Sequence, residues 1–337
     1  MALSSFIRGV GSFVPPKVFT NFDLEKMLDT SDEWIKQRTG ISKRHWVDAD
    51  TCNSDLALEA THAALKDAKL EPGQIDMIIL ATLSPDYDFP GTACFLQAKL
   101  GLSGIPAIDI RQQCTGYLYG LSMADNFIRG GVYKNILVVG SEVHSKGLDL
   151  TPNGRAVSVL FGDGAAATVI SACEVKDPSI DAHVIATSLH ADGNFAKELW
   201  VAAPGTACGS ERLNAAMIAE GLHYPQMNGK SVFMHAVKRM AESLSATCKG
   251  AGVELSDIDI FFFHQANLRI NDKVGEILGL DPAKVFNTIQ DYGNTTAATI
   301  PLGMDVAKSQ GVLKPGMLVA SAAFGSGFTW ASALWRS

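Results

Sequence analysis

The stretch LKDAKLEPGQIDMIIL, at residues 65–80, decides the fold because a similar stretch, CKGAGVELSDIDIFFF, occupies residues 248–263. Each begins like the end of a helix, passes through a short polar turn and an Ile-Asp pair, and ends in an apolar run typical of a buried strand. Self-similarity of this kind indicates a repeated structural unit. The chain therefore reads as two related α/β halves.

A second pair of segments supports the repeat. NILVVGS at residues 135–141 corresponds to GMLVASA at 316–322, and each half ends in a Gly-rich piece that we expect to be hairpin-like, at 161–167 and 324–328. The apolar runs are continuous and do not alternate, as expected for sheets that helices cover on both faces. Two similar α/β halves packed together are the predicted architecture.

Composition and charge narrow the class of protein. With 337 residues and 47% hydrophobic content, the chain can bury one large core or two fused ones. The net charge of −7 comes from 28 basic and 35 acidic residues that are mixed along the sequence. The chain has no basic stripe of the kind that neutralises phosphates, which argues against a nucleic-acid partner.

Membrane and metal signals are weak. The longest apolar runs, such as residues 75–82, fall short of the ~18 residues that suggest a membrane span. Residues 1–8 lack the basic-then-apolar order of a signal peptide, so we expect a cytoplasmic enzyme. The six cysteines form no CxxC pair and have no histidine at metal-ligand spacing, so we expect reduced thiols and no metal.

Residues 199–227 separate the halves and contain two prolines and three glycines. We expect an irregular or partly helical insertion. Loops of this length are often lids or binding loops, but a plain surface excursion explains the composition equally well.

Cys114 is the strongest candidate for a reactive thiol. It follows an expected strand at 107–110 and precedes a segment with the apolar spacing of a helix, 118–128. On such a turn the sulfur lies near a helix amino terminus, where free N–H groups and the helix dipole favour the thiolate. A buried cysteine is more often inert packing, so position alone leaves both interpretations open.

Two polar segments in the second half are candidate partners of this cysteine. His264 follows the apolar run 258–263, and ligands of α/β sheets gather at the carboxyl ends of strands. Asn294 precedes a run of small residues at an expected helix start, where it would otherwise be a simple helix cap. A lone histidine is more often structural, but three such segments in one chain favour a catalytic set.

Four further motifs lie along the chain: DTSDEWI at 29–35, RTGI at 38–41, FGDG at 161–164 and GFTW at 327–330. Together with the Cys/His/Asn set, they make the chain similar to the β-ketoacyl-acyl-carrier-protein synthase III family nearly end to end. The resemblance implies the thiolase fold, with two α/β halves in αβαβα layers. Residues 1–175 would carry the cysteine and residues 176–337 the histidine and asparagine. Related elongating synthases use Cys/His/His, and thiolases use a second cysteine as base.

The resemblance implies a two-stage condensation that begins fatty-acid synthesis. Cys114 attacks an acyl-CoA thioester and becomes acylated. A malonyl thioester then loses carbon dioxide, and its enolate would be stabilised by His264 and the Asn294 amide. Asparagine donates hydrogen bonds but is no general base, which suits decarboxylation. Backbone N–H groups of Cys114 and Ser326 would form the oxyanion hole, provided that Ser326 tolerates the local φ in place of the family's glycine.

Binding residues also carry over from the family. Trp34 and Arg155 would sandwich the adenine of coenzyme A, Arg38 would approach its phosphates, and Asn267 its pantetheine arm. Phe89 would close the acyl pocket of a partner subunit, which implies a homodimer. We expect acyl-CoA as a substrate, acyl carrier protein as a partner, and no metal or redox cofactor.

The chain departs from the family near the nucleophile and at its surface. Arg111, Gln112 and Gln113 stand where small residues are usual, so the acyl substrate is open. The basic patch for the acidic carrier protein is reduced: Arg269 is present, but lysines are replaced at three positions, Met234, Glu276 and Ile277.

These departures leave three alternatives. One is a relative in secondary metabolism that condenses or transfers other acyl groups. The other two, from a different class, are a non-catalytic thiolase-fold partner subunit and a CoA-binding regulator. An intact Cys114 argues against both of the latter.

Overall fold

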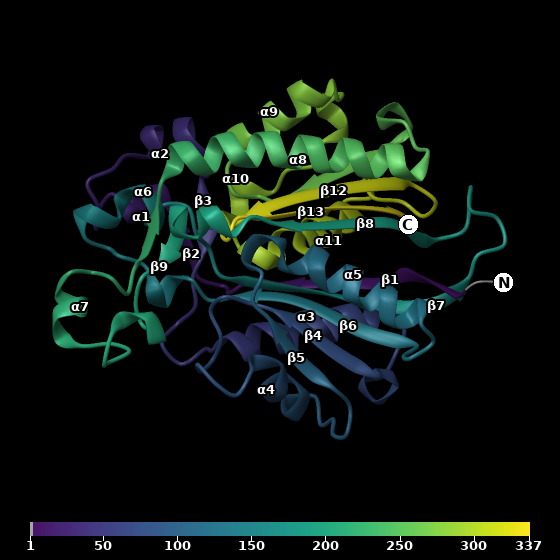
Figure 1. Ribbon diagram of the computed structural model, residues 1–337, viewed down its shortest axis with the longest axis horizontal. Helices are drawn as coiled ribbons and strands as arrows, with labels where there is room; N and C mark the ends of the chain where they lie inside the picture. Colours follow the sequence, from purple (N-terminus) through teal and green to yellow (C-terminus); the bar gives the residue numbers. More distant parts are fainter. Residues whose placement is uncertain (1–2) are drawn as a thin grey trace.

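Two mixed β-sheets form the framework of the computed structural model, which describes residues 3–337 (Figure 1). The first has the strand order β1-β7-β6-β4-β5 and lies entirely in the first half of the chain. Its strands are β1 (Leu3–Phe13), β4 (Met77–Ala81), β5 (Ala107–Ile110), β6 (Asn135–Glu142) and β7 (Gly164–Glu174).

The second sheet has the order β11-β12-β13-β8 and repeats the pairing of the first. Its strands are β8 (His183–Ala191), β11 (Ile260–Phe263), β12 (Leu318–Gly325) and β13 (Thr329–Arg336). Strand β11 runs parallel to β12 as β4 does to β6, and β12 is antiparallel to β13 as β6 is to β7. An isolated parallel bridge between Phe261 and Val285 takes the place of β5. The sequence repeat is therefore a repeat of topology.

Helices fill three layers around the two sheets, which gives the predicted αβαβα order (Figure 1). Helices α5 (Gly116–Arg129) and α11 (Thr299–Ser309) lie between the sheets, α3 (Asn53–Ala68) covers the first, and α8 (Gly229–Ala251) covers the second. Strands β4 and β12 are buried at every residue because helices cover both faces. Apolar clusters fill the spaces between these layers and supply the main stabilising term.

The remaining elements are mostly short. They are β2 (Val18–Thr20), α1 (Asn21–Leu24), α2 (Asp32–Thr39), β3 (Lys43–His45), α4 (Thr92–Lys99), α6 (Arg155–Ser158), β9 (Leu199–Val201), α7 (Ala215–Ala219), β10 (Pro225–Met227), α9 (Leu268–Leu278) and α10 (Ile289–Tyr292). Among them, α4 and α9 also contribute buried residues to the apolar clusters. Within residues 3–337, no helix is long and apolar enough to cross a membrane.

The boundary between residues 175 and 176 that the sequence predicts falls between β7 and β8. Each sheet lies wholly on one side of it. We keep this division of the chain as a proposal, supported by the two topologies.

The structure corrects the sequence prediction for residues 161–167 and extends the prediction for residues 199–227. Residues 161–167 are no hairpin: Phe161 bridges in parallel to Asn294, and the buried Asp163 carboxylate accepts N–H bonds from Val47 and His144 before β7 begins. By contrast, 324–328 does turn between the antiparallel strands β12 and β13. The insertion at 199–227 contains the short helix α7, as expected, but also a two-stranded sheet of β9 and β10.

Candidate active site

Cys114 lies in a short 3-10 turn, Gln113–Thr115, between β5 and α5. Close packing fixes this turn: a Cβ at Gly116 would lie 2.7 Å from the Ala81 Cβ, and one at Gly325 would lie 2.9 Å from the Cys114 Cβ. Only glycine allows β12 to approach the nucleophile so closely. The strand-to-helix placement expected from the sequence is confirmed, and Cys114 is 8% exposed.

The thiol is less acidic than its position at the α5 amino terminus suggests. Burial, the larger cause, and the Glu142 carboxylate at the end of β6 together raise the pKa of the Cys114 thiol to about 12. The helix dipole works in the opposite direction but within the first turn only. Burial outweighs it, so the resting thiol is protonated, contrary to the expectation of a favoured thiolate.

His264 follows β11 directly, and its backbone N–H donates to Ala322 of β12. The side chain is buried, which lowers the pKa of the imidazole to about 3 and keeps it neutral. Its Nδ1 lies 2.8 Å from the Thr299 hydroxyl, whereas its buried Nε2 has no partner among the described residues. The free nitrogen is therefore available to a bound molecule.

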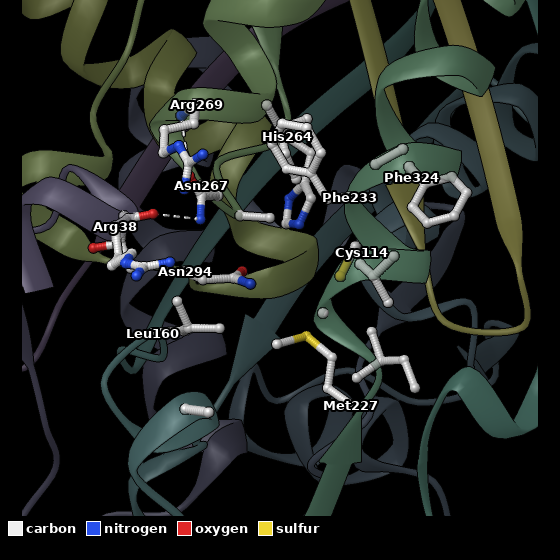
Figure 2. Close-up of a pocket in the computed structure, with 18 of the residues that line it drawn as sticks. Arg38, Cys114, Leu160, Met227, Phe233, His264, Asn267, Arg269, Asn294 and Phe324 are labelled. Atoms are coloured by element: carbon white, nitrogen blue, oxygen red, sulfur yellow. Dashed lines mark hydrogen bonds between the residues drawn. The ribbon is translucent and has the colours of Figure 1, made fainter.

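Asn294 is fixed by the turn that precedes α11. The backbone N–H of Thr296 donates to its Oδ1 at 2.8 Å, and its backbone N–H donates to Leu160. With Oδ1 occupied, the Nδ2 amide group is the free end of the side chain. Figure 2 shows the side chains of Asn294, His264 and Cys114 directed into one cavity from the two halves of the chain.

Two cavities meet at Cys114. The first, here the entrance cavity, has a volume of about 570 Å³ and extends from Cys114 past His264 and Asn294 to Trp34 and Arg269. The second, here the inner chamber, has a volume of about 480 Å³. The linings of both cavities include Cys114, Phe161 and Leu199. The sulfur thus stands at the junction of two spaces of ligand size.

The expected coenzyme A residues lie at or near the outer end of the entrance cavity. Trp34, Arg38 and Asn267 line it, and Asn267 also caps α9 and donates to the Arg38 carbonyl oxygen at 3.0 Å. Arg155 is not among the residues that line the cavity, and its guanidinium stacks on the Trp34 ring at 4.2 Å from the centroid. An adenine could enter the expected sandwich only after these two side chains separate.

The other expected residues occupy different places. Ser326 lines the inner chamber and is not among the left-handed non-glycine residues, so serine fits there without backbone strain. Arg269 lies at the entrance, with its guanidinium over the Phe233 ring. Phe89 lies outside both cavities of its own chain, in the loop before α4, with 82% of its surface exposed.

Sequence reasoning missed Thr296, Thr299 and Glu142. The two threonines hold Asn294 and His264, and Glu142 accepts bonds from the Ser84 hydroxyl and the Leu83 N–H beneath the nucleophile. The strand end at 142 was a weak signal, since sites gather there. Nothing local in the sequence marked the threonines.

A cysteine beside a helix start, with a histidine and an asparagine from a second copy of the same α/β unit, defines an acyltransferase of the thiolase fold. The comparisons with known proteins agree. Models of the 3-oxoacyl-[acyl-carrier-protein] synthase III family match residues 108–193 and, for its C-terminal part, 248–337.

Full-length relatives place the chain more narrowly. It is 42% identical to the β-ketoacyl-[acyl-carrier-protein] synthase III of Caldanaerobacter subterraneus, over 98% of this chain and 97% of that protein. The relative of the same name in Thiobacillus denitrificans is 42% identical over 98% and 99%. The structure of the synthase III of Aquifex aeolicus superimposes with a TM-score of 0.88 at 39% identity, covering 99% of this chain and all of the other. The chain belongs to the β-ketoacyl-[acyl-carrier-protein] synthase III family.

Proposed function

We propose that Cys114, His264 and Asn294 carry out the family's condensation of an acyl-CoA with a malonyl thioester on acyl carrier protein, which starts fatty-acid synthesis. The observation that carries this proposal is the convergence of the three side chains on one cavity at the junction with an inner chamber. The pantetheine arm would occupy the entrance cavity, and the acyl group would pass into the inner chamber.

In the first stage, the Cys114 sulfur forms a bond to the acyl carbon and the bond to the coenzyme A sulfur breaks. Because burial keeps the thiol protonated, a base must accept its proton as the bond forms. The neutral His264 imidazole, with its free Nε2, fits that role and then returns the proton to the leaving coenzyme A thiolate.

In the second stage, malonyl thioester loses carbon dioxide and the enolate carbon attacks the acyl-cysteine. The Asn294 Nδ2 group and the His264 Nε2–H would donate to the enolate oxygen. Expulsion of the Cys114 thiolate completes the 3-oxoacyl thioester, and the sulfur takes up a proton. The backbone N–H groups of Cys114 and Ser326 would hold the tetrahedral oxyanion.

Thr299 would set which nitrogen of His264 holds the proton. Its hydroxyl has one hydrogen and two acceptors within reach, the Thr296 carbonyl oxygen at 3.0 Å and His264 Nδ1 at 2.8 Å. When it donates to Thr296, Nδ1 carries the proton and Nε2 can act as a base. When it donates to Nδ1, Nε2 carries the proton and can stabilise the enolate.

The binding partners extend this proposal. Trp34, Arg38, Arg155 and Asn267 would hold coenzyme A, and Arg269 would attract the acidic carrier protein. The proposed chemistry needs no cofactor, because acyl-CoA and the malonyl thioester supply all reacting groups. We also propose a homodimer closed by Phe89, and a cytoplasmic location.

The division of roles is tested by separating the two stages. After incubation with acetyl-CoA, intact-mass spectrometry should show one acetyl group on the wild-type protein and none on Cys114→Ala. Asn294→Ala should still acquire the acetyl group but release carbon dioxide from malonyl thioester about 100-fold more slowly, because an enolate donor is lost.

Normal condensation by Asn294→Ala would refute the assignment. A wild-type protein that takes up no acyl group from any acyl-CoA would instead indicate a non-catalytic partner subunit or a CoA-binding regulator.

A further inference from the structure

The inner chamber is the space that decides which acyl group the enzyme accepts. It begins at Cys114 and runs away from Trp34 and Arg38, which line only the entrance cavity. An acyl group on the sulfur, with the thioester arm in the entrance cavity, therefore has its distal end in the chamber.

The chamber wall consists mostly of apolar and neutral polar side chains, with the cationic Arg111 among them. Leu148, Phe161 and Val201 are among its apolar residues, and they suit the methylene groups of an acyl chain. Arg111 and two histidines supply its titratable polar groups other than Cys114. None of the described residues that line the chamber is an aspartate or a glutamate.

Three polar side chains of this wall are without protein partners. Arg111 forms no ion pair or side-chain hydrogen bond with any described residue, and neither does the Gln113 carboxamide. The Nδ1 of His223 is buried and also lacks a partner. Arg111 is exposed and Gln113 is half-buried, so water can solvate both, whereas the buried His223 Nδ1 is costly unless a ligand or water satisfies it.

Arg111 is within reach of the acyl chain. It lies three residues before Cys114, so the two Cα atoms are at most about 11 Å apart. Both acidic residues of the nearby 83–92 loop have other partners, because Asp88 is paired with Arg212 and Asp86 accepts from the Ser54 N–H. Arg111 is thus left for a group that enters the chamber.

We propose that the inner chamber accepts an acyl group with a carboxylate at its distal end, as in a dicarboxylic acid joined to coenzyme A through one carboxyl group. Arg111 binds that carboxylate, and Gln113 and His223 add hydrogen bonds. The proposal rests on the proposed function, because it names the acyl donor of the same reaction.

The test compares two donors of equal chain length, glutaryl-CoA and pentanoyl-CoA, by the rate at which each adds mass at Cys114. The wild-type protein should be acylated faster by glutaryl-CoA. Arg111→Gln should lose about tenfold or more of the glutaryl rate and keep the pentanoyl rate, because a charge-assisted contact is removed. Arg111→Lys should recover part of the loss, and Lys176→Gln, an exposed charge far from either cavity, should leave both rates unchanged.

The possible outcomes separate the carboxylate proposal from the proposed condensing function. Faster acylation by pentanoyl-CoA, or equal effects of Arg111→Gln on both donors, would overturn the carboxylate proposal and leave the condensing function intact. Failure of both donors and of acetyl-CoA to acylate Cys114 would overturn the proposed function itself.

Discussion

At the scale of single residues, burial sets the protonation of the site. It raises the pKa of the Cys114 thiol to about 12 and lowers the pKa of His264 to about 3, so both side chains are neutral at rest. A neutral pair costs less to bury than a thiolate and an imidazolium. In the proposed mechanism, the thiol then gives up its proton only as it attacks the substrate thioester.

The raised thiol pKa predicts slow alkylation of Cys114 at neutral pH. With iodoacetamide, the rate at Cys114 should rise continuously from pH 7 to pH 10, because the thiolate fraction keeps growing below a pKa of about 12. Peptide mass spectrometry follows the reaction, and the exposed Cys94 serves as an internal reference. A rate that levels off near pH 7 would show that the thiolate is already formed at rest.

Glu142 predicts a pH dependence of stability. Burial raises the pKa of this carboxyl from its ordinary 4.5 to about 7, so the folded state favours the protonated form. In the wild-type protein, the loss of folding stability caused by ionising this buried carboxyl is absent below pH 4.5 and grows as the pH rises to 7. Relative to wild type, Glu142→Gln should therefore become more stable by up to about 3 kcal/mol between pH 4.5 and pH 8.

Urea unfolding of both proteins at pH 4.5, 6 and 8 measures this difference. Comparing each protein with itself across pH removes the constant effect of replacing a carboxyl by an amide. A difference that stays flat with pH would contradict the raised pKa.

At the scale of elements, strand β6 supports the loop that carries Asn294. Gly140 of β6 packs against the 3-10 turn Thr296–Ala298, and a Cβ there would lie 2.8 Å from the Ala298 nitrogen. Because Thr296 holds the Asn294 amide, a strand of the first half positions a donor of the second.

Gly140→Ala should therefore weaken condensation more than acylation. The added methyl group pushes the 296–298 turn and with it Asn294, and overpacking of this kind costs about 1–3 kcal/mol of stability. The acylation rate and the malonyl decarboxylation rate are measured separately. Gly73→Ala, where an added Cβ meets nothing within 4 Å, is the matched control. Equal losses of the two rates would exclude selective displacement of Asn294.

Elements with continuous apolar runs were predictable, and long-range contacts were not. The expected strand at 107–110 and helix around 118–128 appear as β5 and α5, because local periodicity and burial agree there. The hairpin expected at 161–167 is absent because Phe161 bridges to Asn294, more than 130 positions later, and such a contact leaves no local signature in the sequence. The Arg155 stack on Trp34 and the Thr299 contact with His264 are also products of tertiary packing.

At the scale of the whole molecule, the site exists only where the two halves meet. Cys114 comes from the first half, and His264 and Asn294 from the second (Figure 2). The hydroxyl of Thr115 beside the nucleophile also contacts that of Thr329 at 2.9 Å across the junction. Under the proposed mechanism, neither half alone carries the full set of groups for both stages.

Phe89 predicts the assembly state. A phenylalanine with 82% of its surface exposed suits a contact with a second subunit. By sedimentation velocity, the wild-type protein should be a dimer, and Phe89→Asp should shift it toward monomer and slow acylation. Phe22→Asp, at an exposed phenylalanine of α1, is the matched control and should remain dimeric. A wild-type monomer at micromolar concentration would contradict the proposal.

The β9–β10 excursion at residues 199–227 gives one wall to both cavities and no strand to either main sheet. Substitutions at Trp200, Val201 and His223 therefore change the shape of the inner chamber without removing any contact inside the two sheets. For laboratory evolution, these three side chains are therefore suitable positions to vary, and the residues of the two main sheets are the ones to keep. A library confined to these three positions would sample new shapes of the inner chamber, and we expect the folding of the two main sheets to be kept.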